Sequence, residues 1–421
     1  MMYPLYIDPG TGSMLFSVLV GLLATLYFVG KAAIIKLKFI FSGKKAKEAA
    51  LTDEYPIVVY CEGKQYISLF QGIIQELENR KLKTLYLTGE ESDPAFKTQY
   101  QYVKPEYAGK GNAAFMKLNM ISASVVLMTT PGLNVYQLKR SKGVKHYSHI
   151  LHMASDATMY RLFGLDYFDS VLLSGDYQKA DIRTLETMRN IPQKELVTVG
   201  CPYLDALQEK FANIPPEEKH NFTVLVSPSW GKSAILSRFG KDLLQPLKES
   251  GFNIIVRPHP QSKTSEKEIL DSLMEQFPNS DNFQWDFEKD NIYSLSKADI
   301  MISDFSGIIF DYMFLCDKPF LYVNDDFDLR PYDAYDIVEN DKNAKIWQFE
   351  TLEKCGKRLE SKDFSNIKDL IQSMSDSETL ANNRKIAKET AWQHIGQSSK
   401  LVVDFLESKL GEKILLSKTK Q

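Results

Sequence analysis

Residues 223–260, TVLVSPSWGKSAILSRFGKDLLQPLKESGFNIIVRPHP, contain one complete unit of the fold that the sequence predicts. TVLVSPS (223–229) and NIIVRPHP (253–260) are short apolar runs of the strand type, and the amphipathic FGKDLLQPLKES between them is helix-like. Nearly continuous apolar strands that are separated by helices are typical of parallel sheets covered on both faces. The segment therefore predicts an α/β fold built on a parallel sheet.

The same alternation continues on both sides of this segment. Downstream strand candidates are FQW (283–285), DIMISD (299–304) and PFLYV (319–323). Before a polar, proline-containing break at 213–219, the candidates are PIVVYC (56–61), KTLYL (83–87), SVVLMTT (124–130), HYSHILHM (146–153), SVLLSG (170–175) and LVTVG (196–200). A pattern that restarts after a polar linker predicts two Rossmann-like domains, 46–212 and 213–421. The last fifty residues are predicted to be helices; we assign them to the second domain, although their apolar face can pack on either.

Composition excludes several functional classes. The 421 residues carry a formal net charge of −3, which gives no general electrostatic footprint for nucleic acid. The four cysteines lie far apart and form no C-x-x-C pair, so neither a zinc site nor a redox motif is indicated. We therefore expect no nucleic-acid partner, no metal and no cofactor.

The N-terminal segment differs from the rest of the chain. Pro9–Gly30 contains 22 consecutive uncharged residues, long enough for a helix to cross the hydrocarbon core of a bilayer. Lysines follow this run, and no acidic residue occurs between it and Glu48. This order predicts a membrane anchor with a basic flank at 1–45, a single-pass protein in the cell membrane and a cytoplasmic catalytic part. A buried core helix and a helix lying in the membrane interface are the alternatives.

Open parallel sheets bind ligands at the carboxyl ends of their strands, so the residues that follow the strands are the candidate site. In the second domain, SDFSG (303–307) joins a strand to a helix. Asp304 and Ser306 are good N-cap residue types, and Ser306 with Gly307 allows backbone N–H groups to point outward. A helix start with open donors is typical of phosphate sites.

Two further strand ends complete this candidate site. In RPHP (257–260), the prolines stiffen the turn and present Arg257 and His259, which suit phosphate binding or proton donation. In SPSWGK (227–232), Ser229 offers a hydroxyl, Trp230 an aromatic face for a base, and Lys232 a cation.

The first domain contributes one candidate catalytic residue. His146, His149 and His152 are spaced three apart, but in a strand they alternate faces, and no carboxylate or cysteine completes a ligand set. A metal site is therefore not expected. His152, at the strand end, is predicted to be a general base that faces the phosphate site of the second domain.

Four ordered motifs resemble the CDP-glycerol glycerophosphotransferase family, the enzymes of teichoic-acid primer and polymer synthesis. They are GCPYLD (200–205), SPSWG (227–231), RPHP (257–260) and SDFSGIIFD (303–311), the last followed by Lys318-Pro319. The family has the GT-B fold, so the resemblance implies two Rossmann-like domains facing a cleft. It also implies that His259 and the helix start at Ser306 hold the donor pyrophosphate. Asp311, in the last motif, is included among the substrate-binding residues, and His152 corresponds to the family's catalytic base.

Together, the residues and the resemblance predict a transferase. It would move glycerol phosphate, or a related alcohol phosphate, from a CDP-linked donor to a hydroxyl of a lipid-linked glycan or polymer, releasing CMP. The alternatives are a GT-B glycosyltransferase or epimerase that uses a nucleotide sugar, and a non-catalytic scaffold with a degenerate GT-B domain.

Overall fold

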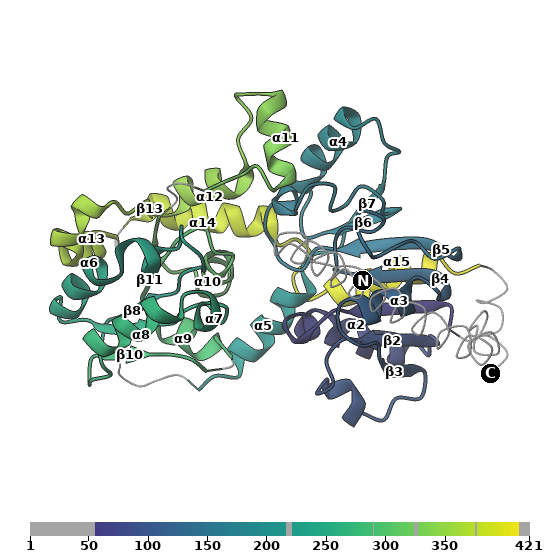
Figure 1. Ribbon diagram of the computed structural model, residues 1–421, viewed down its shortest axis with the longest axis horizontal. Helices are drawn as coiled ribbons and strands as arrows, with labels where there is room; N and C mark the ends of the chain where they lie inside the picture. The colour runs from purple at the N-terminus through teal and green to yellow at the C-terminus, as the bar shows by residue number, and fades with distance from the viewer. Residues whose placement is uncertain (1–54, 216–220, 289, 324–326, 375–376, 412–421) are drawn as a thin grey trace, which may run out of the picture. The chain divides into compact units, whose positions relative to one another are not determined.

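The structure is a computed structural model that describes residues 55–215, 221–288, 290–323, 327–374 and 377–411. All of these residues lie within one unit of the chain, Asp53–Gln421. The unit contains two parallel β-sheets with helices packed around them (Figure 1). The predicted α/β fold with two parallel sheets is therefore confirmed.

The first sheet has seven strands in the order β3-β2-β1-β4-β5-β6-β7. The strands are β1 (Ile57–Cys61), β2 (Thr84–Thr88), β3 (Val103–Tyr107), β4 (Ser122–Met128), β5 (Gly143–Ile150), β6 (Ser170–Leu173) and β7 (Glu195–Thr198). The chain order reverses between β1 and β4, so the topological switch point lies at the carboxyl ends of these two strands.

The second sheet has six strands in the order β10-β9-β8-β11-β12-β13. The strands are β8 (Thr223–Val226), β9 (Asn253–Val256), β10 (Phe283–Trp285), β11 (Ile300–Ser303), β12 (Phe320–Tyr322) and β13 (Lys357–Arg358). Its switch point lies between β8 and β11, which directly precede two of the motifs singled out in the sequence.

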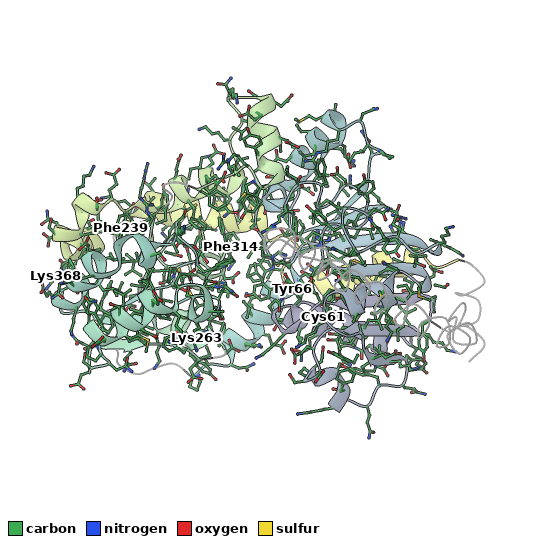
Figure 2. The ribbon with its side chains drawn as sticks, viewed as in Figure 1. Cys61, Tyr66, Phe239, Lys263, Phe314 and Lys368 are labelled. Atoms are coloured by element: carbon green, nitrogen blue, oxygen red, sulfur yellow. The ribbon has the colours of Figure 1, made fainter. Side chains whose placement is uncertain are left out.

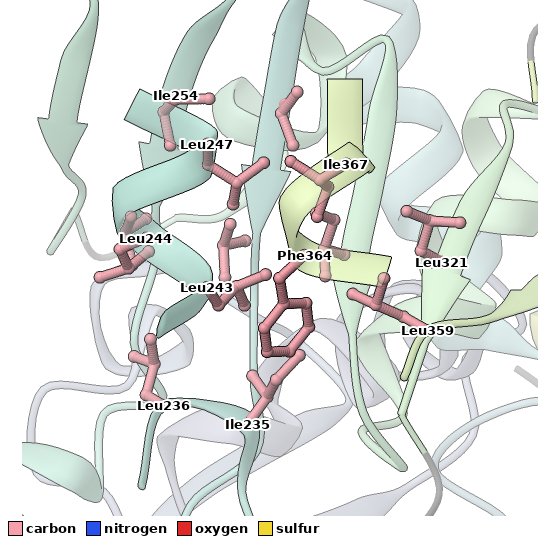
Figure 3. Close-up of a cluster of buried hydrophobic side chains, with 14 of the residues drawn as sticks. Ile235, Leu236, Leu243, Leu244, Leu247, Ile254, Leu321, Leu359, Phe364 and Ile367 are labelled. Carbon is pink, nitrogen blue, oxygen red and sulfur yellow. The ribbon is translucent and has the colours of Figure 1, made fainter. Parts of the chain in front are cut away.

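Helices bury both faces of the second sheet, which explains why its central strands are apolar throughout. On one face, α6 (Ile235–Glu249) and α13 (Ile367–Met374) enclose a cluster that includes Leu243, Phe364 and Ile367 (Figure 3). The other face is covered by α5 (Pro202–Ala212), α10 (Ile308–Cys316), α12 (Trp347–Cys355) and α14 (Glu378–Ala391).

The C-terminal helices reach both sheets. Within α15 (Ser398–Ser408), Val402, Phe405 and Leu406 are buried in the core of the first sheet, beside α2 (Ile67–Asn79) (Figure 1). The preceding helix, α14, packs instead on α10 and α12. The apolar face identified in the sequence is thus buried. The domain boundaries at 45/46 and 212/213 stay predictions.

The GCPYLD motif (200–205) holds the connection between α14 and α15, where the chain passes from the second sheet to the first. Asp205 accepts hydrogen bonds from Trp392 Nε1 and from the amides of Gly396 and Ser398, at 2.9, 2.9 and 3.1 Å. Gly200 has φ +88°, and a Cβ added there would lie 2.3 Å from the carbonyl oxygen of Gln393. The motif therefore requires glycine for conformation and for space, and aspartate as an acceptor.

The predicted membrane span falls outside the described residues, because Pro9–Gly30 lies within 1–54. Among the helices that the structure does describe, none combines the length and the apolar character needed to cross a membrane. On this finding the prediction of a single-pass membrane protein with a cytoplasmic catalytic part is wrong. It has no place in the functional proposal below.

Candidate active site

A cavity of about 280 Å³ is lined by residues that follow strands of both sheets. His152 and Met153 follow β5 of the first sheet, whereas Ser229, His259 and Ser306 follow β8, β9 and β11 of the second. Ligands of open parallel sheets bind at these strand ends. The cavity is therefore the candidate active site.

The cavity contains six of the ten residues predicted for the site. His152, Ser229, Trp230, His259, Ser306 and Gly307 line it, whereas Lys232, Arg257, Asp304 and Asp311 do not. The histidines of the two sheets thus share one cavity. The roles of the six residues stay predictions.

The start of α10 presents open amide donors to the cavity. Gly307 is the N-cap residue, and no side chain caps the helix. The amide of Ser306 donates to Asp304, but no hydrogen bond within the described residues uses the amides of Gly307 or Ile308. A Cβ added at Gly307 would lie 2.4 Å from Cε of Met153, so this flexible side chain covers the helix start.

Asp304 does not line the cavity, but it holds the loops that do. Its side chain is 1% exposed, and its carboxylate accepts hydrogen bonds from the amides of Ser229, Ile235 and Ser306 at 2.9–3.2 Å. Burial raises its pKa, and the amide donors oppose that shift. The structure thus places Asp304 where it fixes the loops that line the cavity.

His259 faces the cavity with a defined tautomer. Its Nδ1 accepts a hydrogen bond from the amide of Gln261 at 3.1 Å, so in the neutral ring the hydrogen is on Nε2. Burial lowers its pKa, opposed by the carboxylate of Glu266. The ring of Trp230, 49% exposed, lies beside it with centroids 6.3 Å apart. His259 therefore offers an N–H donor next to an exposed aromatic face.

Three predicted binding residues have other surroundings. The guanidinium of Arg257 pairs with Asp286 and donates to the carbonyl of Glu288 at 2.7 Å. Lys232 is exposed outside the cavity. Asp311 is buried within α10 and accepts a hydrogen bond from Tyr203 Oη at 3.0 Å, and burial raises its pKa to about 7. The structure gives Arg257 and Asp311 protein partners, and their roles as donor-binding residues stay predictions.

His152 lies on the opposite side of the cavity in an apolar setting. Its Nδ1 lies 3.0 Å from Tyr160 Oη, and the ring of Tyr66 packs edge-on with centroids 5.4 Å apart (Tyr66 is labelled in Figure 2). Burial lowers the pKa of His152 to about 4. The imidazole is therefore neutral at pH 7 and able to accept a proton.

Sequence reasoning missed the wall formed by Phe327 and Tyr332. Both line the cavity, although they follow the second sheet's β12 by several residues. The segment pairs with the chain near Tyr160: the amide of Leu162 donates to the carbonyl of Pro331, and the amide of Asp333 to that of Tyr160. No local pattern reveals this pairing, because it joins residues about 170 positions apart.

A buried ion cluster holds the same segment. Arg189 donates to Asp166, Asp333 and Asp336 at 2.6–2.7 Å.

Within the described residues, no group of three or more His, Cys, Asp or Glu side chains is arranged to hold a metal ion. All four cysteines are free thiols.

Two parallel sheets, with a cavity at the carboxyl ends of strands from both, define the GT-B class of transferase folds. Solved structures agree with this class. The wall teichoic acid polymerase TagF matches with a TM-score of 0.51 and 14% identity, over 89% of this chain and 96% of TagF. UDP-GlcNAc 2-epimerase from Methanocaldococcus jannaschii matches with a TM-score of 0.51 and 12% identity, over 84% of this chain and 99% of the epimerase. At these identities the likeness shows the fold alone.

The family model for CDP-Glycerol:Poly(glycerophosphate) glycerophosphotransferase matches residues 169–407, more than half of the chain. The chain therefore belongs to the CDP-glycerol glycerophosphotransferase family and is an enzyme of that kind. This confirms the resemblance drawn from the four motifs. No curated protein matches the sequence.

Asp304→Ala should destabilise the second sheet's half of the cavity. The variant leaves three amides without their acceptor, and a buried unsatisfied donor costs about 1–3 kcal/mol. We expect urea unfolding to show a loss of about 3 kcal/mol or more, together with weaker binding of CDP-glycerol. The exposed Asp242, replaced by alanine, is the control. Full stability with full binding would contradict this assignment.

Asp311→Asn should leave activity within a few-fold but change the pH dependence of stability. The Asp311 carboxyl keeps its proton up to a pKa of about 7 when folded, against 3.8 as the ordinary value. The unfolded chain loses that proton first, so this group costs stability increasingly between pH 4 and 7. The melting temperature of the variant should therefore exceed that of the wild type at pH 8 and match it near pH 4. Unchanged stability with lost donor binding would restore Asp311 to the substrate site.

Proposed function

We propose that the enzyme transfers glycerol phosphate from CDP-glycerol to a hydroxyl of a glycan or polymer. The acceptor oxygen attacks the β-phosphorus and forms a new P–O bond. The bond between that phosphorus and the bridging oxygen breaks, and CMP leaves with the electron pair. The acceptor proton passes to Nε2 of His152.

The observation that carries this proposal is the pairing of two different histidines in one cavity. His152, neutral and without a charged partner among the described residues, suits a general base. Opposite it, His259 offers Nε2–H, and the start of α10 offers the amides of Gly307 and Ile308. These donors suit the charge that develops on the leaving phosphate.

The donor nucleotide would lie on the side of the second sheet. Trp230 provides an exposed ring for the base, and the helix start with His259 would hold the pyrophosphate. Ser229, whose amide is fixed by Asp304, would place a hydroxyl beside the phosphates. Arg257 and Lys232 are left out of this proposal, because they do not line the cavity.

The acceptor is proposed to be a growing polymer of the teichoic acid type, or the glycan that primes it. Support comes from the family's poly(glycerophosphate) substrate and from the fold shared with a wall teichoic acid polymerase. A lipid attached to that acceptor was predicted from the sequence and remains a proposal.

The rival function is that of a nucleotide-sugar enzyme. The fold shared with UDP-GlcNAc 2-epimerase allows it, and such an enzyme would attack a sugar carbon in place of phosphorus. Turnover of CDP-glycerol against UDP-GlcNAc separates the two functions. A non-catalytic scaffold would bind nucleotide and turn over neither.

His152→Ala should lower kcat while leaving donor affinity within a few-fold, because His152 lies on the acceptor side. A general base contributes about 100- to 10,000-fold. The base works only when unprotonated, so kcat/KM of the wild type should rise with pH through about 4 and be flat above pH 6. Steady-state kinetics between pH 3 and 8 test this. His146→Gln is the control, because His146 lies on β5, the strand that His152 follows, but contacts Ser170 outside the cavity. Near-normal kcat in a folded His152→Ala enzyme would refute the base assignment.

His259→Ala should impair the donor side. Loss of one preorganised donor to a developing phosphate charge typically costs about 100- to 1,000-fold in kcat. Binding of CDP-glycerol, measured by calorimetry, should weaken as well. His394→Asn is the matched control, since His394 is exposed with φ +54°, a conformation that asparagine tolerates. Equal losses in the two variants would contradict the donor role.

A further inference from the structure

One tyrosine hydroxyl lies between two imidazoles at the edge of the cavity. Tyr160 Oη lies 3.0 Å from Nε2 of His149 and 3.0 Å from Nδ1 of His152. His149 is on β5 and fully buried, whereas His152 follows the strand and lines the cavity. The three side chains therefore form a chain of two hydrogen bonds that ends at the proposed base.

When Tyr160 donates to an imidazole, the number of hydrogens allows two arrangements of these three side chains. Burial raises the pKa of Tyr160 and lowers the pKa of His149 to about 3 and that of His152 to about 4. All three groups are thus neutral at pH 7, and each imidazole carries one N–H. Tyr160 has one hydrogen, so if it donates to one ring, the other ring must donate to it; alternatively, Tyr160 accepts from both rings and donates to the hydroxyl of Thr129, which also puts the hydrogen of His152 on Nδ1.

The two arrangements differ at the catalytic atom. If His152 donates from Nδ1 to Tyr160, then Tyr160 donates to His149, and Nε2 of His152 has a free lone pair. If His149 donates to Tyr160, then Tyr160 donates to Nδ1 of His152, and Nε2 carries the hydrogen. Only the first arrangement lets Nε2 accept a proton from a substrate hydroxyl.

We propose that His149 and Tyr160 are positioning residues that hold His152 in the tautomer with hydrogen on Nδ1. The inference rests on the proposed role of His152 as the base. Tyr160 then occupies the place that a carboxylate has in a Ser-His-Asp triad, accepting the Nδ1 hydrogen and fixing the ring. His149 directs the tyrosine hydrogen away from His152.

The surroundings of the three side chains are largely aromatic, and the proposed arrangement places the hydrogen of His149 on Nδ1, a buried atom with no hydrogen-bond partner among the described residues. Tyr66 packs on His152 and Phe168 on His149, with centroids 5.4 and 5.0 Å apart. Within the described residues, no hydrogen bond or ion pair joins a carboxylate to either imidazole. Asp156 lines the same cavity but bonds to Thr158. The hydroxyl of Thr129 is buried beside Tyr160 and is within reach of the tyrosine hydroxyl.

Nitrogen-15 NMR of the histidine side chains tests the tautomer without any substrate. With His152 assigned from a His152→Gln sample, the wild type should show a protonated Nδ1 and a bare Nε2 at pH 7. His149→Leu should reverse this pattern, because Tyr160 then donates to His152. His149→Gln should preserve it, because the amide oxygen can accept the tyrosine hydrogen. A wild-type His152 with its hydrogen on Nε2 would overturn the proposal.

Kinetics with CDP-glycerol provide the second test. His149→Leu should lower kcat by up to about 10,000-fold with donor affinity within a few-fold, as expected for a wrong tautomer. Adding Tyr160→Phe should recover part of that loss, because phenylalanine cannot donate to His152. Losses that add in the double variant would overturn the proposal. If the enzyme does not use CDP-glycerol at all, the proposed function fails, and the NMR result still decides the tautomer.

Discussion

The buried carboxylate of Asp304 determines the geometry of the donor side. It joins two loops that are distant in sequence, since it accepts hydrogen bonds from the amides of Ser229 and Ile235 in one loop and from the amide of Ser306 in its own. Burial disfavours the charged carboxylate, and these amides compensate for the lost solvation. Because Asp304 uses its oxygens in this way, the loops after β8 and β11 are fixed, and the amides of Gly307 and Ile308 stay open. The proposed phosphate site thus depends on a residue that does not line it.

The proposed acceptor side depends on a neutral histidine in an apolar setting. His152 has aromatic neighbours in Tyr66 and Tyr160 and no carboxylate partner within the described residues, so burial alone lowers its pKa. A neutral base opposite hydrogen-bond donors suits a reaction in which a proton leaves one side while negative charge grows on the other. The class of chemistry follows from this asymmetry, and its assignment to glycerol phosphate follows from the family.

Sequence patterns predicted most of the fold and part of the site. Central strands such as IMIS (300–303) are apolar on both faces and were recognised for that reason, whereas β3 (Val103–Tyr107) was missed because it is partly exposed and contains Pro105. Strand ends predicted His152, His259 and Ser306, because parallel strands bring their carboxyl ends together. The ion pair of Arg257 with Asp286, the burial of Asp311, and the wall containing Tyr332 depend on tertiary packing that no local pattern encodes.

We propose that this cavity transfers glycerol phosphate with loss of CMP. Phosphorus-31 NMR of the enzyme with CDP-glycerol and a short poly(glycerol phosphate) acceptor follows this reaction. CMP and new phosphodiester should appear in equal amounts as the pyrophosphate signals of CDP-glycerol disappear. Unchanged CDP-glycerol, in a parallel sample where UDP-GlcNAc is consumed, would contradict it.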